Sequence, residues 1–187
     1  MDVFDNTIVV GTGLPARMLQ LFDARSLSEP VRQFECPLLL QLTSISCFDS
    51  GEQGVAFYVT SAEGRCSVRF VDKAHDEKST FSFKCHRKKR QCYPVHAVKS
   101  CPQVPSSFAT AGGDGAINFW DWQKRLRLKA HEPQGERIPV TAIAYGPHRL
   151  FAYSCGEDAS MGPGTGNPRW TPRVRVTQLD NSHETRG

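Results

Sequence analysis

The sequence predicts an all-β protein made of four successive units of similar size. Short runs rich in β-branched and aromatic residues recur along the chain, and turns rich in Gly, Pro, Asp or Ser separate them. No stretch has the apolar spacing of an amphipathic helix. The stretch 84–131 combines a His, a Gly-Asp-Gly turn and a Trp-Asp strand within one unit of about 40–45 residues.

That stretch is the reference for the other units. It opens with Cys85-His86, passes through the turn Gly112-Gly113-Asp114-Gly115, and continues into a strand that ends in Trp120-Asp121. A His, a Gly-Asp-Gly turn and a Trp-Asp pair in this order are the signature of one blade of a WD-type propeller. The predicted fold class is therefore a WD-repeat β-propeller.

Composition is that of a folded globular protein. The 187 residues are 39% hydrophobic and 22% charged, which is enough apolar material for a core. No apolar run reaches about 18 residues, so no membrane-spanning helix is predicted, and the acidic start at 1–6 does not resemble a secretory signal. The seven cysteines are an odd number, which favours free thiols in a reducing compartment. The net charge of +4 points to no particular partner.

The first unit, residues 7–35, is predicted to be an incomplete blade. Its three expected strands lie at 7–12, 18–23 and 31–35. Phe22-Asp23 takes the place that Trp120-Asp121 has in the reference unit. Only six residues precede the first strand, so we expect no innermost strand here.

The second and third units are predicted to be full blades. In the second, residues 38–86, we expect four strands, at 38–48, 55–60, 65–72 and 79–85, with a charged loop at 73–78. In the third, residues 92–131, we expect strands at 93–99, 108–111, 116–121 and 125–131. The third unit alone carries both the Gly-Asp-Gly turn and the Trp-Asp pair.

The last unit, residues 138–180, is predicted to lack its outer strand. Strands are expected at 140–145, 150–155 and 173–179, with a long Gly- and Pro-rich loop at 156–172 and a frayed tail at 181–187. A propeller avoids exposed strand edges by closing its ring. Four units, two of them incomplete, therefore predict a partial propeller, the C-terminal part of a larger ring.

Four residues of the reference unit are expected to form a buried hydrogen-bonded tetrad. They are His86, Thr110, Asp114 and Trp120, and their polar groups satisfy one another inside the blade. An alternative interpretation is a hydrolase triad of Cys85, His86 and Asp114. We favour the structural interpretation, because Cys85 alternates with Phe81 and Phe83 as a packed side chain.

A second alternative is a zinc site in the region rich in Cys and His. The candidate ligands are Cys85, His86, Cys92, His96 and Cys101. Their spacing is irregular, without a Cys-x-x-Cys pair, and alternating strand positions direct some of them to opposite faces. No metal and no cofactor is therefore predicted.

The strongest cluster of charge is His86-Arg87-Lys88-Lys89-Arg90. It is either a solvated loop, a nuclear-import signal or a patch for phosphate or an acidic peptide. Propeller topology places the loop after an outer strand on the same rim as the turn before Arg65. Nucleic-acid binding is not favoured, because Tyr93 is the only aromatic residue near these basic side chains.

With these motifs laid out, the chain resembles the Bub-family mitotic (spindle) checkpoint WD-repeat proteins and their close relatives, the mRNA-export WD-repeat proteins of the nuclear pore. The resemblance covers about residues 55–155 and is weaker over 1–34. It is carried by motifs in one order: Glu63-Gly64-Arg65, Phe83-Lys84-Cys85-His86-Arg87, Tyr93-Pro94-Val95, the stretch 108–115 and Asn118-Phe119-Trp120-Asp121. Tyr93-Pro94-Val95 favours the checkpoint group.

The resemblance implies a seven-bladed propeller, of which this chain is roughly the C-terminal half, without catalysis. It implies a scaffold that binds short linear motifs of checkpoint kinases and phosphorylated repeats of a kinetochore scaffold, in the nucleus and at kinetochores in mitosis or also in the cytoplasm. A ubiquitin-ligase checkpoint complex is a further implied partner. The residues carried over to peptide or phosphopeptide binding are Arg65, Arg87 and Lys88. An mRNA-export adaptor at the nuclear pore is the alternative. No membrane partner is expected.

Overall fold

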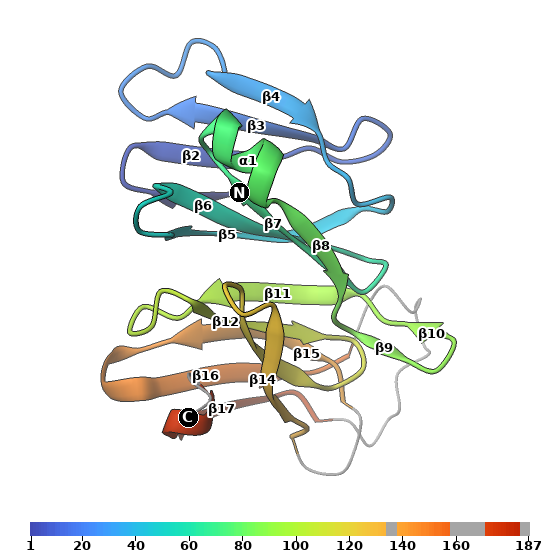
Figure 1. The fold of residues 1–187 in the computed structure, drawn as a ribbon. Coiled ribbons are helices and arrows are strands. Elements are labelled where there is room, and N and C mark those ends of the chain that lie inside the picture. The colour runs from blue at the N-terminus through green and yellow to red at the C-terminus, as the bar shows by residue number, and fades with distance from the viewer. Residues whose placement is uncertain (134–137, 158–170, 184–187) are drawn as a thin grey trace.

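Four antiparallel β-sheets of three or four strands follow one another along the chain, with a two-stranded hairpin between the second and third, in this computed structural model, which describes residues 1–133, 138–157 and 171–183. Figure 1 shows the sheets stacked face to face in chain order, from β1–β4 at the top to β15–β17 at the bottom. The inner strands β1, β5, β11 and β15 contact one another in sequence. This arrangement is an all-β, propeller-like fold, as the sequence predicts.

Each sheet is a meander in which consecutive strands pair. The first contains β1 (Asp2–Phe4), β2 (Thr7–Gly11), β3 (Met18–Asp23) and β4 (Arg32–Glu35). The second contains β5 (Leu42–Asp49), β6 (Val55–Ser61), β7 (Arg65–Phe70) and β8 (Phe81–Lys84). The third contains β11 (Val95–Ser100), β12 (Ser107–Gly112), β13 (Ile117–Asp121) and β14 (Leu126–His131). The fourth contains β15 (Val140–Tyr145), β16 (Leu150–Cys155) and β17 (Arg173–Gln178).

The expectation that the first unit has no inner strand is wrong. β1 pairs with β2 over three residues, and the carboxylate of Asp2 accepts the backbone N–H of Cys47 in β5 at 2.8 Å. The expectation rested on length, because only six residues precede β2. In the structure the Asp2 carboxylate instead satisfies a backbone donor of the neighbouring sheet, so the acid helps to hold the strand in place.

The segment predicted as a charged loop at 73–78 is a helix, α1 (Lys73–Ser79). The carboxylate of Asp72 accepts the backbone N–H of His75 at 2.9 Å, so Asp72 is the N-cap. The helix leads from β7 into β8, and this insertion shortens the expected strand to Phe81–Lys84.

The contacts of Asp76 fix this helix. Its side chain is 2% exposed and accepts hydrogen bonds from Arg69 at 2.6 and 2.8 Å, from Arg32 and Thr80 at 2.6 Å, and from the backbone N–H of Phe70 at 3.1 Å. Burial raises the pKa of Asp76, but the bonds from Arg69, Thr80, Phe70 and Arg32 outweigh it and lower the pKa to about 2. Since Arg32 belongs to β4, this network joins the first sheet to the second.

The first part of the predicted frayed tail, 181–183, is ordered against the third sheet, and residues 184–187 lie outside the described range. Asn181–His183 forms a 3₁₀ turn, and His183 is buried with its ring 4.8 Å from that of Phe119, so the tail docks against the third sheet at this point. A 3₁₀ turn also precedes β16, at Pro147–Arg149. Most of the predicted loop, residues 158–170, lies outside the described range.

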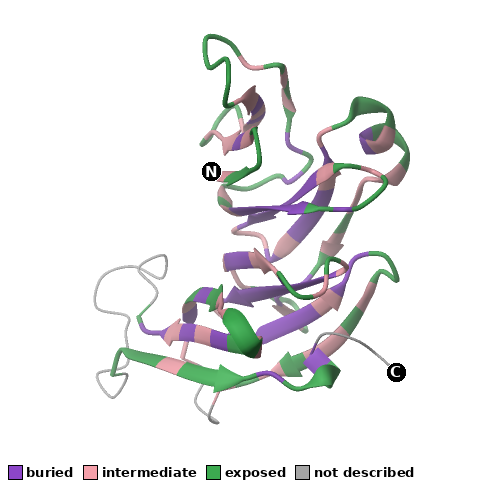
Figure 2. Cartoon of the chain, turned by 90° about the vertical axis from the view of Figure 1, so that its left-hand side faces the viewer, coloured by how far each residue is buried: buried purple, intermediate pink, exposed green. Residues whose placement is uncertain are grey.

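The core is a series of layers between neighbouring sheets. Figure 2 shows the buried residues concentrated along strands and the exposed residues in turns and at the outer edges. Between the second and third sheets, Tyr58 stacks on Phe48 and Phe108, with ring centroids 4.3 and 4.0 Å apart. Such aromatic pairs add about 0.5–1.5 kcal/mol each beyond burial of their area. Within the described ranges, no helix has the length and apolarity needed to cross a membrane.

Candidate functional site

The turn between β6 and β7 positions two of the three predicted peptide-binding residues. Gly64 has a φ of +71°, and a Cβ there would lie 2.5 Å from the carbonyl oxygen of His86. Only glycine allows this turn to approach the segment that follows β8 so closely. Glu63 and Arg65 flank the glycine, and Arg87 comes from the approached segment.

Arg65 and Arg87 lie together because both contact Glu63. Arg65 Nε is 3.6 Å from Glu63 Oε2, and Arg87 Nη2 is 3.9 Å from the same oxygen. Arg87 Nη2 also donates to the backbone carbonyl of Glu63 at 3.1 Å. The other carboxylate oxygen of Glu63 accepts the backbone N–H of Leu39 at 2.8 Å. We call Glu63, Arg65 and Arg87 the arginine rim.

The electrostatics of the arginine rim favour an anionic ligand. Two guanidinium groups share one carboxylate, which leaves a formal charge of +1. The carboxylate side chain is 12% exposed, whereas those of Arg65 and Arg87 are 33% and 28% exposed. The solvent therefore reaches cationic surface more readily than the neutralising oxygen. A guanidinium with a free face suits bidentate binding of phosphate or carboxylate.

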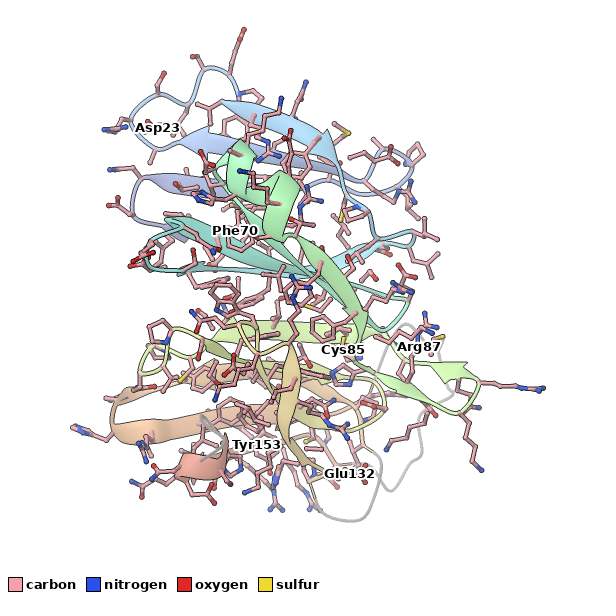
Figure 3. The ribbon with its side chains drawn as sticks, viewed as in Figure 1. Asp23, Phe70, Cys85, Arg87, Glu132 and Tyr153 are labelled. Atoms are coloured by element: carbon pink, nitrogen blue, oxygen red, sulfur yellow. The ribbon has the colours of Figure 1, made fainter. Side chains whose placement is uncertain are left out.

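Lys88, the third predicted residue, does not contact Glu63. It lies in a two-stranded hairpin, β9 (Arg87–Lys88) and β10 (Gln91–Cys92), in the stretch expected to be a loop. Lys88 Nζ pairs with Glu132 Oε1 at 2.9 Å. Figure 3 shows Arg87 close to the start of this hairpin, and Figure 1 shows the hairpin projecting from the stacked sheets. The hairpin turn carries two further exposed cations, Lys89 and Arg90.

The predicted tetrad is brought together as a chain of buried hydrogen bonds. His86 is fully buried, its Nδ1 lies 2.7 Å from Asp114 Oδ1, and its Nε2 lies 2.9 Å from Thr110 Oγ1. The indole N–H of Trp120 donates to the same hydroxyl at 2.9 Å. The chain is complete when Thr110 donates to Nε2 and Nδ1–H donates to Asp114. Burial raises the pKa of Asp114, but the hydrogen bonds from His86 and from the backbone N–H of Ala116 leave the pKa below its ordinary value.

These contacts leave no catalytic pair between Cys85 and His86. The Cys85 thiol lies 3.5 Å from the carbonyl oxygen of Gly64, and both His86 nitrogens face other partners. Burial raises the pKa of the Cys85 thiol, which disfavours the reactive thiolate. Among residues 1–133, 138–157 and 171–183, no three His, Cys, Asp or Glu side chains are grouped to hold a metal ion.

Sequence reasoning assigned no role to Glu63 or Glu132. Glu63 belongs to the Glu-Gly-Arg motif, but its partner Arg87 lies 24 residues further along the chain. Glu132 pairs with Lys88 across 44 residues. No local pattern predicts either partner, because residues 24 and 44 positions apart meet only in the folded chain.

No family model matches the chain. Individual proteins do. The mitotic checkpoint protein bub-3 of Caenorhabditis elegans is 40% identical over 135 residues, which cover 68% of this chain and 38% of that protein. The mRNA export factor GLE2 of Chaetomium thermophilum is 36% identical and covers 87% of this chain and 44% of its own length. The spindle assembly checkpoint protein bub3 of Schizosaccharomyces pombe is 31% identical, with coverages of 84% and 49%.

A solved structure supports the fold. A chain in a crystal structure of the mitotic checkpoint complex superposes with a TM-score of 0.65 over 83% of this chain and 45% of that one, at 16% identity. The present chain spans about half the length of the relatives that it matches, or somewhat less. Both groups named by the sequence resemblance are thus found. The chain is a homologue of the Bub3 checkpoint proteins and the Gle2/RAE1 mRNA export factors.

Proposed function

We propose that this chain is a non-catalytic scaffold that binds linear peptides in spindle-checkpoint signalling, and that the arginine rim with Lys88 binds their acidic or phosphorylated residues. The observation that carries the proposal is the convergence of Arg65 and Arg87 on Glu63, with about a third of each guanidinium side chain exposed. Checkpoint kinase motifs and phosphorylated kinetochore repeats are the proposed ligands, and the nucleus and kinetochore are the proposed locations. Assembly into a ubiquitin-ligase checkpoint complex belongs to the same proposal.

Fluorescence anisotropy with a labelled phosphothreonine peptide rich in Asp and Glu tests the rim. Binding of this peptide should fall about tenfold to a hundredfold in Arg65→Glu and in Arg87→Glu, because each loses a charge-assisted hydrogen bond and adds a repelling charge. Lys73→Glu is the matched control, since Lys73 is 75% exposed on α1 and makes the same charge change away from the rim. The unphosphorylated peptide should bind more weakly. Equal binding by all three variants contradicts the proposed role.

The mRNA-export group is the second candidate, because GLE2 matches 87% of the chain. The two functions differ in the expected ligand. An export adaptor that contacts RNA should bind a poly(A) oligonucleotide with an affinity that falls steeply as salt rises, because phosphate contacts release counterions. A checkpoint scaffold should prefer the phosphopeptide. An excess of the oligonucleotide added as a competitor should displace little of the bound phosphopeptide.

A further inference from the structure

The sheets at the two ends of the stack each have a face that points away from the rest of the chain. Figure 1 places the first sheet, β1–β4, and the fourth sheet, β15–β17, at opposite ends. Buried layers pack the first sheet on the second and the fourth on the third. We call the other face of the first sheet the first end face, and that of the fourth sheet the fourth end face.

Strand register identifies the side chains of the fourth end face. Paired residues of neighbouring strands point to the same side of a sheet, and successive residues of a strand alternate. Phe151 and Tyr153 lie in the buried layer shared with the third sheet, so their neighbours in β16 point outward. The outward set is Ala142, Ala144, Leu150, Ala152, Ser154, Val174, Val176 and Gln178. None of these side chains is charged, and Val174 and Val176 are 76% and 65% exposed.

The first end face is apolar over three of its four strands. Leu19 and Leu21 of β3 lie in the buried layer shared with the second sheet, so the residues that alternate with them point outward. The outward set on β1, β2 and β3 is Val3, Ile8, Val10, Met18, Gln20 and Phe22. On β4 the outward residues are Gln33 and Glu35, which are polar and exposed. The apolar part is therefore three strands wide, as is the fourth sheet.

Both end faces have the composition of a covered surface. An antiparallel sheet with one face in water normally carries polar side chains on that face. A contiguous exposed apolar patch instead marks an interaction site. The two faces also differ in side-chain size, because Ala142, Ala144 and Ala152 lie on the fourth end face, whereas Met18 and Phe22 lie on the first. Small residues opposite large ones allow two sheets to interdigitate.

We propose that the fourth end face of one chain packs on the first end face of a second copy, and that the same contact in reverse closes the pair into one ring. Each contact repeats the packing of successive sheets within the chain. A head-to-tail contact of this kind closes when the two copies are related by a half turn. Two copies supply eight large sheets, within the range that propellers use. They also approach the length of the relatives, of which one chain spans about half.

The head-to-tail pair fits these faces better than a contact between identical faces. Two fourth end faces would place small side chains against small ones and leave both first end faces in water. In the head-to-tail pair, both apolar faces of each chain are covered at once. The described part of the fourth sheet has three strands, so with the inner strands aligned as they are within the chain, β4 has no strand opposite it. Gln33 and Glu35 therefore stay in solvent.

Sedimentation equilibrium of the full chain measures the association. We expect twice the mass of one chain at about 10 μM and above, and no larger species. Val176→Glu and Val3→Glu should each raise the dissociation constant at least about a hundredfold, because the closed pair would bury two unpaired carboxylates. Val3 is 51% exposed, so, like Val176, it tolerates a polar side chain in the single chain. Circular dichroism of each variant checks the fold, and Val176→Thr, which keeps the β-branched shape, should weaken the pair only several-fold.

Leu39→Glu is the matched control. Leu39 is 67% exposed in the connection between the first and second sheets, away from both end faces, and the change adds the same charge. It should leave the dissociation constant within about twofold. Arg65→Glu, in the arginine rim, should also keep the pair, so a failure of this proposal and a failure of the proposed function give different results.

Four results would overturn the proposal. A chain that stays monomeric up to about 100 μM would leave the end faces to sheets of another polypeptide. A series of species larger than two chains would show an open head-to-tail assembly instead of a ring. Dissociation by only one of Val176→Glu and Val3→Glu would show a contact between identical faces. Equal weakening by Leu39→Glu would assign the effect to charge in general.

Discussion

Replacing Asp76 by Asn tests whether the buried network at α1 holds the first two sheets together. The carboxylate is 2% exposed and binds Arg32 and Arg69 at once. Its pKa of about 2, against an ordinary value of 3.8, corresponds to about 2.5 kcal/mol of stability at neutral pH. The amide also leaves two guanidinium groups without a counter-charge, which adds to the loss. We expect a loss of about 2–4 kcal/mol and a drop in melting temperature of roughly 5–10 °C for a chain of this size.

The dependence on pH gives this prediction a sign. The folded pKa of Asp76 lies below the unfolded value, so the stabilisation is fully present above the unfolded pKa and is lost as the pH falls through the folded one. The difference in melting temperature between wild type and Asp76→Asn should therefore be constant above about pH 5 and shrink between about pH 4 and pH 2.

Thermal unfolding followed by circular dichroism from pH 2 to pH 8 measures both quantities. Glu77→Gln is the matched control, because Glu77 is the next residue on the same helix, is 65% exposed and lies 3.9 Å from Lys73. An exposed pair of this kind contributes about 0–1 kcal/mol. Equal changes in melting temperature in Asp76→Asn and Glu77→Gln would refute the reasoning. So would a difference in melting temperature between wild type and Asp76→Asn that does not change with pH.

Three further predictions concern single residues. Glu63→Gln should strengthen binding of the phosphothreonine peptide several-fold in anisotropy, because it removes the carboxylate that competes for Arg65 and Arg87; weaker binding would show that Glu63 instead orients them. Gly64→Ala should lower the free energy of unfolding, measured by urea denaturation, by more than the roughly 1 kcal/mol typical of a single substitution, because its Cβ meets a backbone oxygen at 2.5 Å; an unchanged free energy contradicts the close approach. Thiol labelling under native conditions should modify Cys92 at once and the six buried cysteines only on unfolding, which mass spectrometry of the labelled peptides resolves.

The sequence was sufficient for the repeating strands and for the tetrad, because both are encoded within one unit. The Gly-Asp-Gly turn and the Trp-Asp pair fix the register of β12 and β13. This register pairs Thr110 with Asn118, and the indole N–H of Trp120, two residues along β13, reaches the Thr110 hydroxyl. His86 stands near the start of the reference stretch 84–131, so it could be assigned as well. Local spacing and strand pairing carried all of this information.

The features that sequence reasoning missed depend on contacts between sheets. The segment before Thr80 consists mainly of charged residues and looks like a solvated loop, although Asp72 is a good N-cap. It becomes a packed helix because Arg32, 44 residues earlier, reaches Asp76. β1 is similar, since this strand of three residues also contacts the next sheet through the bond between Asp2 and Cys47, 45 residues apart. A single unit carries no sign of such partners.

The hydrogen bonds of His86 have a consequence for how this architecture can be cut and duplicated. His86 follows the last strand of the second sheet, yet both of its ring nitrogens bind residues of the third. A protein fragment cut between His86 and β11 would keep the imidazole on one piece. The carboxylate of Asp114 and the hydroxyl of Thr110 would then lose this partner on the other piece. The structural repeat that can be moved as a unit therefore does not have the same bounds as a single β-sheet. It starts at the histidine and ends before the next one in the pattern. A break just ahead of His86 therefore keeps the hydrogen-bonded groups on one piece, whereas a break within the connection 87–94 separates His86 from Thr110 and Asp114.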